Sequence, residues 1–186
     1  MIPVPAGAAR STRSVMGNRF EVGPSRIEGK GAFAIEPIKK GQLICRMEGE
    51  EISIPELKRR YKSGAERSCD PLQVRESRYL DLSEPYIFIN HLCGPNAAII
   101  RFNELVAVKD IAVGEEITYD YSLTDWPDYE AWDNYGDWFM ECVCNSRLCR
   151  KKIEEWPFLP KHIQEKAIRL GVVQDYILRK FENHGK

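Results

Sequence analysis

The fold of this chain is decided by one stretch of nine residues, Phe88-Ile89-Asn90-His91-Leu92-Cys93-Gly94-Pro95-Asn96. The apolar run from Tyr86 to Ile89 predicts a strand that delivers an amide and an imidazole side by side. Asn and His are costly to bury unless each finds hydrogen-bond partners, so a strand that ends in both indicates a site. The competing interpretation is a strand end with one satisfied core histidine, and the flanking sequence must decide between the two.

The whole chain has the composition of an ordinary globular domain. Its 186 residues are 43% hydrophobic and 30% charged, with a formal net charge of −1, so no overall field favours nucleic acid or a membrane surface. No apolar run reaches the ~18 residues of a bilayer span. The N-terminus also lacks the apolar core of a signal peptide. We therefore expect an intracellular protein, cytoplasmic or nuclear, that is not secreted and has no transmembrane segment.

Upstream of the Asn-His pair, glycine turns separate short segments. Residues 1–18 are small, polar and basic, and predict a flexible leader. Two glycines flank Lys30, where glycine permits positive φ and close approach of the backbone to a ligand; a plain hairpin turn is the alternative. The third glycine and following helix of a dinucleotide-binding fingerprint are missing. We expect strands near 19–22, 43–47, 72–74 and 79–82, a helix over 54–63 and a loop over 64–71.

Downstream, the alternation continues as far as Tyr121. Residues 97–102 and 105–108 predict a hairpin, and residues 115–121 predict a strand with Tyr119 and Tyr121 on one face. Short strands split by Gly and Pro turns therefore dominate from Phe20 to Tyr121. The sequence favours a mainly β domain of the α+β class.

Residues 125–138 form an acidic, aromatic connector. Aromatic residues recur at every third position and are interleaved with five acids, which could make a wall that attracts a cationic peptide. The alternative is a segment whose aromatic rings pack on the core while its acids face water. The aromatic residues are Trp126, Tyr129, Trp132, Tyr135 and Trp138.

Three of the six cysteines cluster within eight residues, at Cys142, Cys144 and Cys149. This C-x-C-x4-C spacing suits tetrahedral zinc better than disulfides, and it fits a reducing compartment. A fourth ligand must come from elsewhere, and Cys93 is a natural candidate beside Cys45 and Cys69. The alternative is a set of reduced structural cysteines.

The last thirty residues predict one or two amphipathic helices, broken at Gly171 and docked on the body. The chain then divides into a leader (1–18), a main domain (19–124), the connector (125–138), a cysteine segment (139–156) and a helical tail (157–186).

Four of these motifs, in this order, resemble those of the SET-domain family of protein lysine methyltransferases. They are the glycine turn at 29–34, the Asn-His stretch at 88–96, the strand at 114–121, and the cysteines at 142–149 followed by Arg150, which resemble the zinc-binding post-SET segment. The resemblance covers about residues 19–156, is weak across 50–85, and is to the short stand-alone members. The chain departs from the family at Ile87, Leu92, Gly94 and Lys151.

The resemblance implies a SET-domain fold of small curled β-sheets with a pseudoknot, in which the segment of Asn90 and His91 is threaded next to that of Tyr121. It also implies S-adenosylmethionine as methyl donor, and zinc in a post-SET segment that is fastened over this cofactor. The implied cofactor-binding residues are Lys30, Gly31, Ala32, Asn90, His91, Tyr121 and Ile153. The implied zinc ligands are Cys93, Cys142, Cys144 and Cys149.

Methyl transfer from a sulfonium to an amine is an in-line displacement, so the protein must mainly align the two reactants. The lysine must arrive neutral, although roughly one in 2,500 is neutral at pH 7. Tyr121 is the expected catalytic hydroxyl, which would orient the amine. Tyr119 would hold a water and crowd the amine, which favours monomethylation. The alternative is that both tyrosines are strand residues packed in the core.

The expected function is transfer of a methyl group to a lysine of a basic protein, with histone as the default substrate and no membrane partner. A second hypothesis is a catalytically silent SET-like module that binds a peptide or a partner protein. A third is a zinc-stapled nucleic-acid-binding domain, which the net charge of −1 and the acidic connector disfavour.

Overall fold

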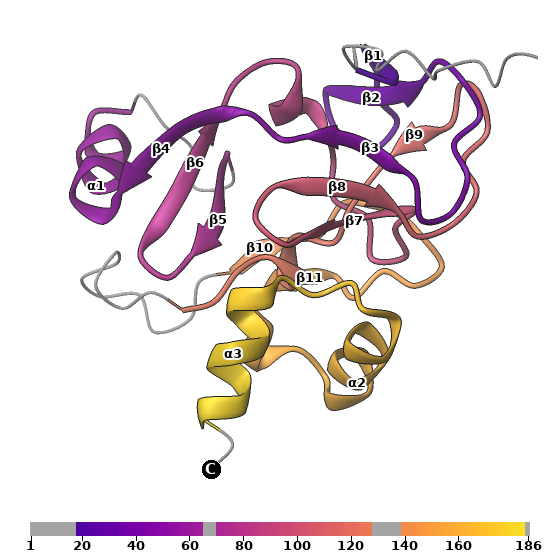
Figure 1. Cartoon of the computed structure of the whole chain (residues 1–186). Coiled ribbons are helices and arrows are strands. Elements are labelled where there is room, and N and C mark those ends of the chain that lie inside the picture. The colour runs from indigo at the N-terminus through magenta and orange to yellow at the C-terminus, as the bar shows by residue number, and fades with distance from the viewer. Residues whose placement is uncertain (1–17, 65–69, 128–138, 185–186) are drawn as a thin grey trace, which may run out of the picture.

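The computed structural model describes residues 18–64, 70–127 and 139–184, and within these ranges the chain is built mainly of β-strands (Figure 1). In these described residues, eleven short strands pair in antiparallel fashion into four small sheets. Within the described ranges, the α-helices are one that directly follows the fourth strand and two in the C-terminal tail. The expected mainly β fold of small sheets is confirmed.

The first sheet joins the glycine turn to the segment that precedes the two tyrosines. Strand β2 (Lys30–Ala34) pairs on one side with β1 (Phe20–Pro24) and on the other with β9 (Glu116–Ile117). Gly29 lies at φ +48° just before β2, a conformation that glycine adopts without steric cost. The sheet therefore places the glycine turn next to residues 116 and 117, near the C-terminal end of the main domain.

Two further sheets complete the main body. One has the order β3 (Leu43–Arg46), β8 (Glu104–Ala107), β7 (Ala97–Ile100). The other has the order β4 (Gly49–Ser53), β6 (Arg78–Leu82), β5 (Pro71–Arg75), and α1 (Ile54–Lys62) follows β4. Strand β4 was not expected from the sequence, whereas α1 and the hairpin of β7 and β8 were.

Two expected strands are wrong in whole or in part. The run before Asn90 is a short 3₁₀ helix, η1 (Tyr86–Phe88), because the Ser83 carbonyl accepts the Tyr86 N–H and starts a turn. Only Glu116 and Ile117 form a strand in the expected stretch 115–121. Beyond them the Asp120 carboxylate accepts the Ser122 N–H and begins a second 3₁₀ helix, η2 (Tyr121–Leu123).

The cysteine segment is closed by a hairpin that the sequence did not predict, in which β10 (Phe139–Glu141) pairs with β11 (Lys152–Glu154). The tail continues through η3 (Trp156–Phe158), α2 (Lys161–Leu170) and α3 (Asp175–His184). Gly171 ends α2 in the left-handed conformation, so the expected break is confirmed.

A second hydrophobic core holds the tail on the body. Trp156 and Ile177 are fully buried in it, and they pack with Leu123 from the end of the main domain. Gln174 on the tail also donates to the Gln73 carbonyl of β5. The described helices include none that is long and apolar enough to cross a membrane. Most of the acidic, aromatic connector, residues 128–138, lies outside the described residues.

Candidate functional site

The site is built where two distant segments lie side by side, residues 90–97 and 116–121, a contact that we call the central junction. The N–H of Tyr119 donates to the Asn90 carbonyl at 3.2 Å, and the N–H of Leu92 donates to the Tyr119 carbonyl at 3.1 Å. This pairing is a parallel bridge between His91 and Tyr119 in an otherwise antiparallel fold. The expected pseudoknot requires these two segments to lie next to each other.

The Asn96 side chain fastens the other end of the central junction. Its amide donates to the Glu116 carbonyl at 2.8 Å, and its oxygen accepts the N–H of Thr118 at 2.9 Å. One buried side chain thus satisfies two backbone groups of the facing segment, in the place of a strand neighbour. A buried asparagine with fewer partners would be costly, which explains why this residue type ends the motif.

The Asn90 amide nitrogen connects the central junction to the glycine turn. It donates to the Lys30 carbonyl at 2.8 Å and to a Glu116 carboxylate oxygen at 2.8 Å, with Ser25 Oγ at 3.2 Å and the Glu28 carbonyl at 3.3 Å. Backbone carbonyls and one carboxylate therefore gather at a single point. Such a set of acceptors suits a cationic group.

Gly31 leaves room for the close approach of Glu116. A Cβ atom at residue 31 would lie 2.3 Å from Glu116 Oε1, a contact that would force the carboxylate away. The same carboxylate accepts a hydrogen bond from Ser25 Oγ at 2.8 Å. The glycine turn thus brings a negative charge beside Asn90.

The two tyrosines lie together at the central junction, as expected from the period of two. Their ring centroids are 4.7 Å apart. Tyr121 is partly buried and its hydroxyl donates to the Ile89 carbonyl at 3.0 Å, whereas Tyr119 is buried and belongs to the main core. The Tyr121 hydroxyl is therefore held one residue away from Asn90.

His91 is a buried imidazole that contacts both halves of the site. Its Nδ1 accepts the N–H of Tyr121 at 3.2 Å, and its Nε2 lies 3.2 Å from Cys93 Sγ. Burial lowers the pKa of His91 to about 4, an effect that Asp120 opposes and Arg150 reinforces. The ring is therefore neutral at pH 7. Because Nδ1 accepts, Nε2 carries the proton and donates toward the sulfur.

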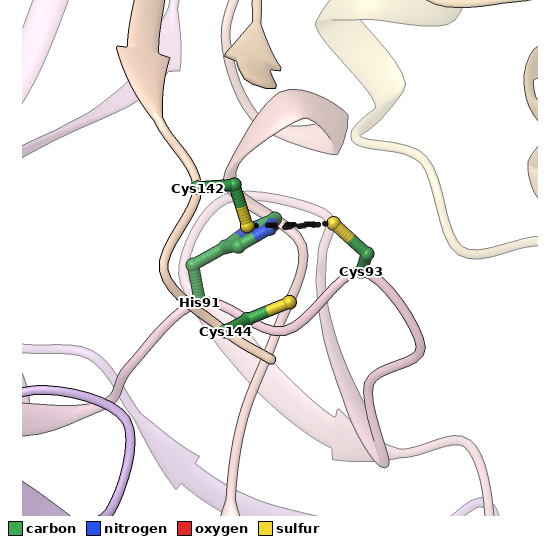
Figure 2. A group of neighbouring side chains, drawn as sticks. All are labelled: His91, Cys93, Cys142 and Cys144. Carbon is green, nitrogen blue, oxygen red and sulfur yellow. Dashed lines mark hydrogen bonds between the residues drawn. The ribbon is translucent and has the colours of Figure 1, made fainter. Parts of the chain in front are cut away.

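Four potential metal ligands point toward one centre (Figure 2): His91, Cys93, Cys142 and Cys144, whose ligand atoms all lie within 4.8 Å of one another. Soft sulfur and imidazole donors at this spacing suit a tetrahedral metal ion. Burial raises the pKa of Cys93 to about 11 and also raises that of Cys142, so an ion would have to displace their protons. Cys149 lies beside this group, with Sγ 3.7 Å from the Cys142 carbonyl oxygen.

A buried ion pair, which we call the clamp, ties the cysteine segment to the central junction. Arg150 Nη1 and Nη2 each donate to a different oxygen of Asp120 at 2.7 Å, and Nη2 also donates to Ser122 Oγ at 3.1 Å. The side chains of Arg150 and Asp120 are only 13% and 4% exposed. The backbone N–H of Arg150 further donates to Cys93 Sγ at 3.3 Å. Arg150 thus connects Cys93 to Asp120, the residue before Tyr121.

The structure brings the expected site residues together around the central junction. Ile153 is buried against Tyr121 and the cysteines, and Ala32 is buried in β2. The Lys30 side chain is exposed and stacks over the Phe88 ring, so this residue meets the site through its carbonyl.

Sequence reasoning missed four residues: Ser25, Glu116, Asp120 and the Arg150 side chain. Glu116 and Asp120 lie in a stretch that was expected to be half buried. An acid that is buried needs a partner, so this placement could have identified both residues.

The family model of the SET domain matches residues 29–122, about half of the chain. Three similar proteins carry histone-lysine N-methyltransferase names. A probable enzyme of Caenorhabditis briggsae is 30% identical, over 67% of this chain and 56% of that protein. A histone H3 lysine-9 specific enzyme of Fusarium mangiferae is 32% identical, over 66% and 45%. A histone H3 lysine-4 specific enzyme of Schizosaccharomyces pombe is 31% identical, over 71% and 15%.

Two solved structures are also similar to this chain. A humanized mutant of the Chaetomium thermophilum Polycomb Repressive Complex 2 matches with a TM-score of 0.51 and 26% identity, over 61% of this chain and 16% of that one. An autoinhibited form bound to S-adenosylmethionine matches with the same TM-score, 25% identity and the same coverage. The chain thus spans 56% or less of the length of every relative named above.

Replacing Arg150 by alanine leaves the Asp120 carboxylate buried without its partner, so we expect a loss of about 3–5 kcal/mol in unfolding free energy. Arg147→Ala removes an exposed arginine from the same segment and should cost less than about 0.5 kcal/mol. Urea unfolding of the two variants measures both values. Equal losses of unfolding free energy in the two variants would show that the clamp does not stabilise the fold.

Proposed function

The chain belongs to the SET-domain family, and from its site we propose that it is a protein-lysine methyltransferase that uses S-adenosylmethionine. The observation that carries this proposal is the convergence of the glycine turn, Asn90 and the Tyr121 hydroxyl at the central junction. These three segments are remote in sequence, and a purely structural role for each would not require them to meet. The order of the motifs and the names of the relatives support the same reading.

The acceptors around Asn90 fit the cofactor, whose ammonium and sulfonium groups are both positive. The carbonyls of Glu28 and Lys30 and the carboxylate of Glu116 would hold the ammonium group of its amino-acid end. Gly31, Ala32, His91, Tyr121 and Ile153 would line the remainder. When bound, S-adenosylmethionine supplies an electrophilic methyl group.

The role of Tyr121 is to orient the incoming amine. Its hydroxyl is fixed by the Ile89 carbonyl, so the phenol oxygen can direct its remaining lone pairs toward an approaching lysine. The buried rings of Tyr119 and His91 beside it would keep bulk solvent away from the reacting centre. A dry wall lowers the pKa of an entering lysine, which then arrives more often as the neutral nucleophile.

A zinc ion held by Cys93, Cys142, Cys144 and Cys149 is the second part of the proposal. His91 has a neutral ring whose Nδ1 already accepts from Tyr121, so its Nε2–H would donate to the Cys93 thiolate rather than bind the ion. Cys149 would then supply the fourth ligand. The ion would fix the post-SET segment, and with it Ile153, against Tyr121.

The substrate proposed is a lysine in a basic peptide of a histone or another basic protein, mainly monomethylated, inside the cell. The named relatives differ in the histone H3 lysine that their names specify, so they support the substrate class without selecting a lysine. The division into leader, SET domain (19–124), connector, post-SET segment and tail is part of this proposal.

Tyr121→Phe should lower methyl transfer by about 10²–10³-fold, because it removes one oriented hydroxyl from the reacting centre. Transfer of radiolabelled methyl groups to mixed core histones and a cell lysate measures this effect. The matched control is Tyr86→Phe. It removes from a core tyrosine a hydroxyl that donates to Asn18, and it should keep nearly full activity. Cofactor binding by both wild type and variant, with no transfer by wild type to any substrate, would instead favour a silent module.

Tyr119→Phe should shift the product from monomethyl-lysine toward dimethyl- and trimethyl-lysine, because loss of the hydroxyl frees space beside the amine. Mass spectrometry of the product peptide at complete turnover gives the distribution. An unchanged distribution would assign Tyr119 to the core alone.

Substitution with cobalt(II) tests the ligand set. We expect one ion per chain with a four-thiolate absorption spectrum that His91→Gln preserves and Cys149→Ser changes. Cys45→Ser alters a buried thiol of the main core and should leave the spectrum intact. The reverse result, with His91→Gln changing the spectrum and Cys149→Ser preserving it, would make His91 the ligand.

A further inference from the structure

A cavity of about 310 Å³ lies between α2 and the sheet of β7 and β8, where the proposed methyl transfer gives it no role. Ala98 of β7 and Val106 of β8 face each other across the strand pair and form its floor. Ile163, Ala167 and Leu170 of α2 recur at helical spacing and form its roof. The cavity shares one wall with the site, at Cys93 and Asp120.

Two apolar side chains that line the cavity are also exposed to solvent. They are Leu148 from the cysteine segment and Leu170 from α2, which are 61% and 53% exposed. Apolar walls around a concave site are typical of small-molecule pockets. The volume lies near the lower end of the usual range for small-molecule pockets, about 300–1,000 Å³.

Lysines outnumber acids among the residues that line the cavity. Three lysines line it: Lys40, Lys109 and Lys166. The one acid in the lining, Asp120, is already paired with Arg150. Within residues 18–64, 70–127 and 139–184, Lys40 and Lys166 have no carboxylate at ion-pair distance, and Lys109 donates to the Gly94 carbonyl at 3.0 Å. The cavity therefore combines apolar walls with three lysines whose ammonium groups make no ion pair within the described residues.

We propose that this cavity binds a small amphipathic monocarboxylate of the medium-chain fatty-acid class. The alkyl chain would pack between α2 and the floor of Ala98 and Val106. The carboxylate would meet Lys40 and Lys166 at the rim, where charge complementarity selects an anion over a neutral chain. A bound chain would also pack on Leu148, so it would hold the cysteine segment against the body.

Titration of the full chain with decanoate, followed by calorimetry and by protein NMR, tests this proposal. We expect saturable binding of one decanoate per chain, with shifted resonances at Val106, Ala167 and Leu148. Val106→Phe fills the cavity from a partly exposed position and should abolish binding. The double variant of Lys40→Glu and Lys166→Glu should weaken binding by about tenfold or more.

The control is Lys161→Glu, which makes one such charge reversal on α2 at a side chain that is 87% exposed and does not line the cavity. It should bind decanoate as the wild type does, and decanol should bind the wild type more weakly than decanoate.

Three results would overturn the proposal: no saturable binding, binding that survives Val106→Phe, or equal affinity for decanol. Dimerisation in light scattering that Val106→Phe abolishes, with no decanoate binding, would assign the cavity to a second copy of the chain. A failure of methyl transfer would leave this test unaffected, because calorimetry reads binding alone.

Discussion

The rest of the structure depends on two hydrogen bonds between the Asn96 side chain and the backbone of residues 116 and 118. They hold together two segments that no regular sheet joins. Because Asn96 is buried, either bond left unmade would expose the full cost of an unsatisfied polar group in the core. Together with the backbone hydrogen bonds between Asn90, Tyr119 and Leu92, this fixed point sets the register between the Asn-His pair and the two tyrosines.

Around this junction the polar groups are connected into one network rather than isolated pairs. Asp120 accepts from Arg150 and caps η2, Arg150 contacts Cys93, and Cys93 meets the ring of His91. His91 in turn accepts from Tyr121. Each charge is compensated by a neighbour that also has a partner, which is the condition under which buried polar groups specify one arrangement. The tyrosine hydroxyl and the thiols are therefore positioned by the same contacts.

Much of this arrangement could be anticipated from sequence, for reasons that are local. Positive φ at Gly29, the break at Gly171 and the side-by-side tyrosines all depend on residues close in the chain. The strand expected before Asn90 failed because the Ser83 carbonyl competes for the backbone N–H groups. The clamp of Arg150 and Asp120 could not be foreseen, since it joins positions thirty residues apart that periodicity cannot relate.

The partners of Cys93 have a further consequence for the newly made chain. Cys142 lies 49 residues after Cys93, and translation at about 5–20 residues per second separates their synthesis by roughly 2–10 seconds. During that interval the glycine turn, Asn90 and Cys93 already exist, while the segment that buries the thiol does not. The nascent chain therefore carries the Cys93 thiol before the cysteine segment that contacts it has been made.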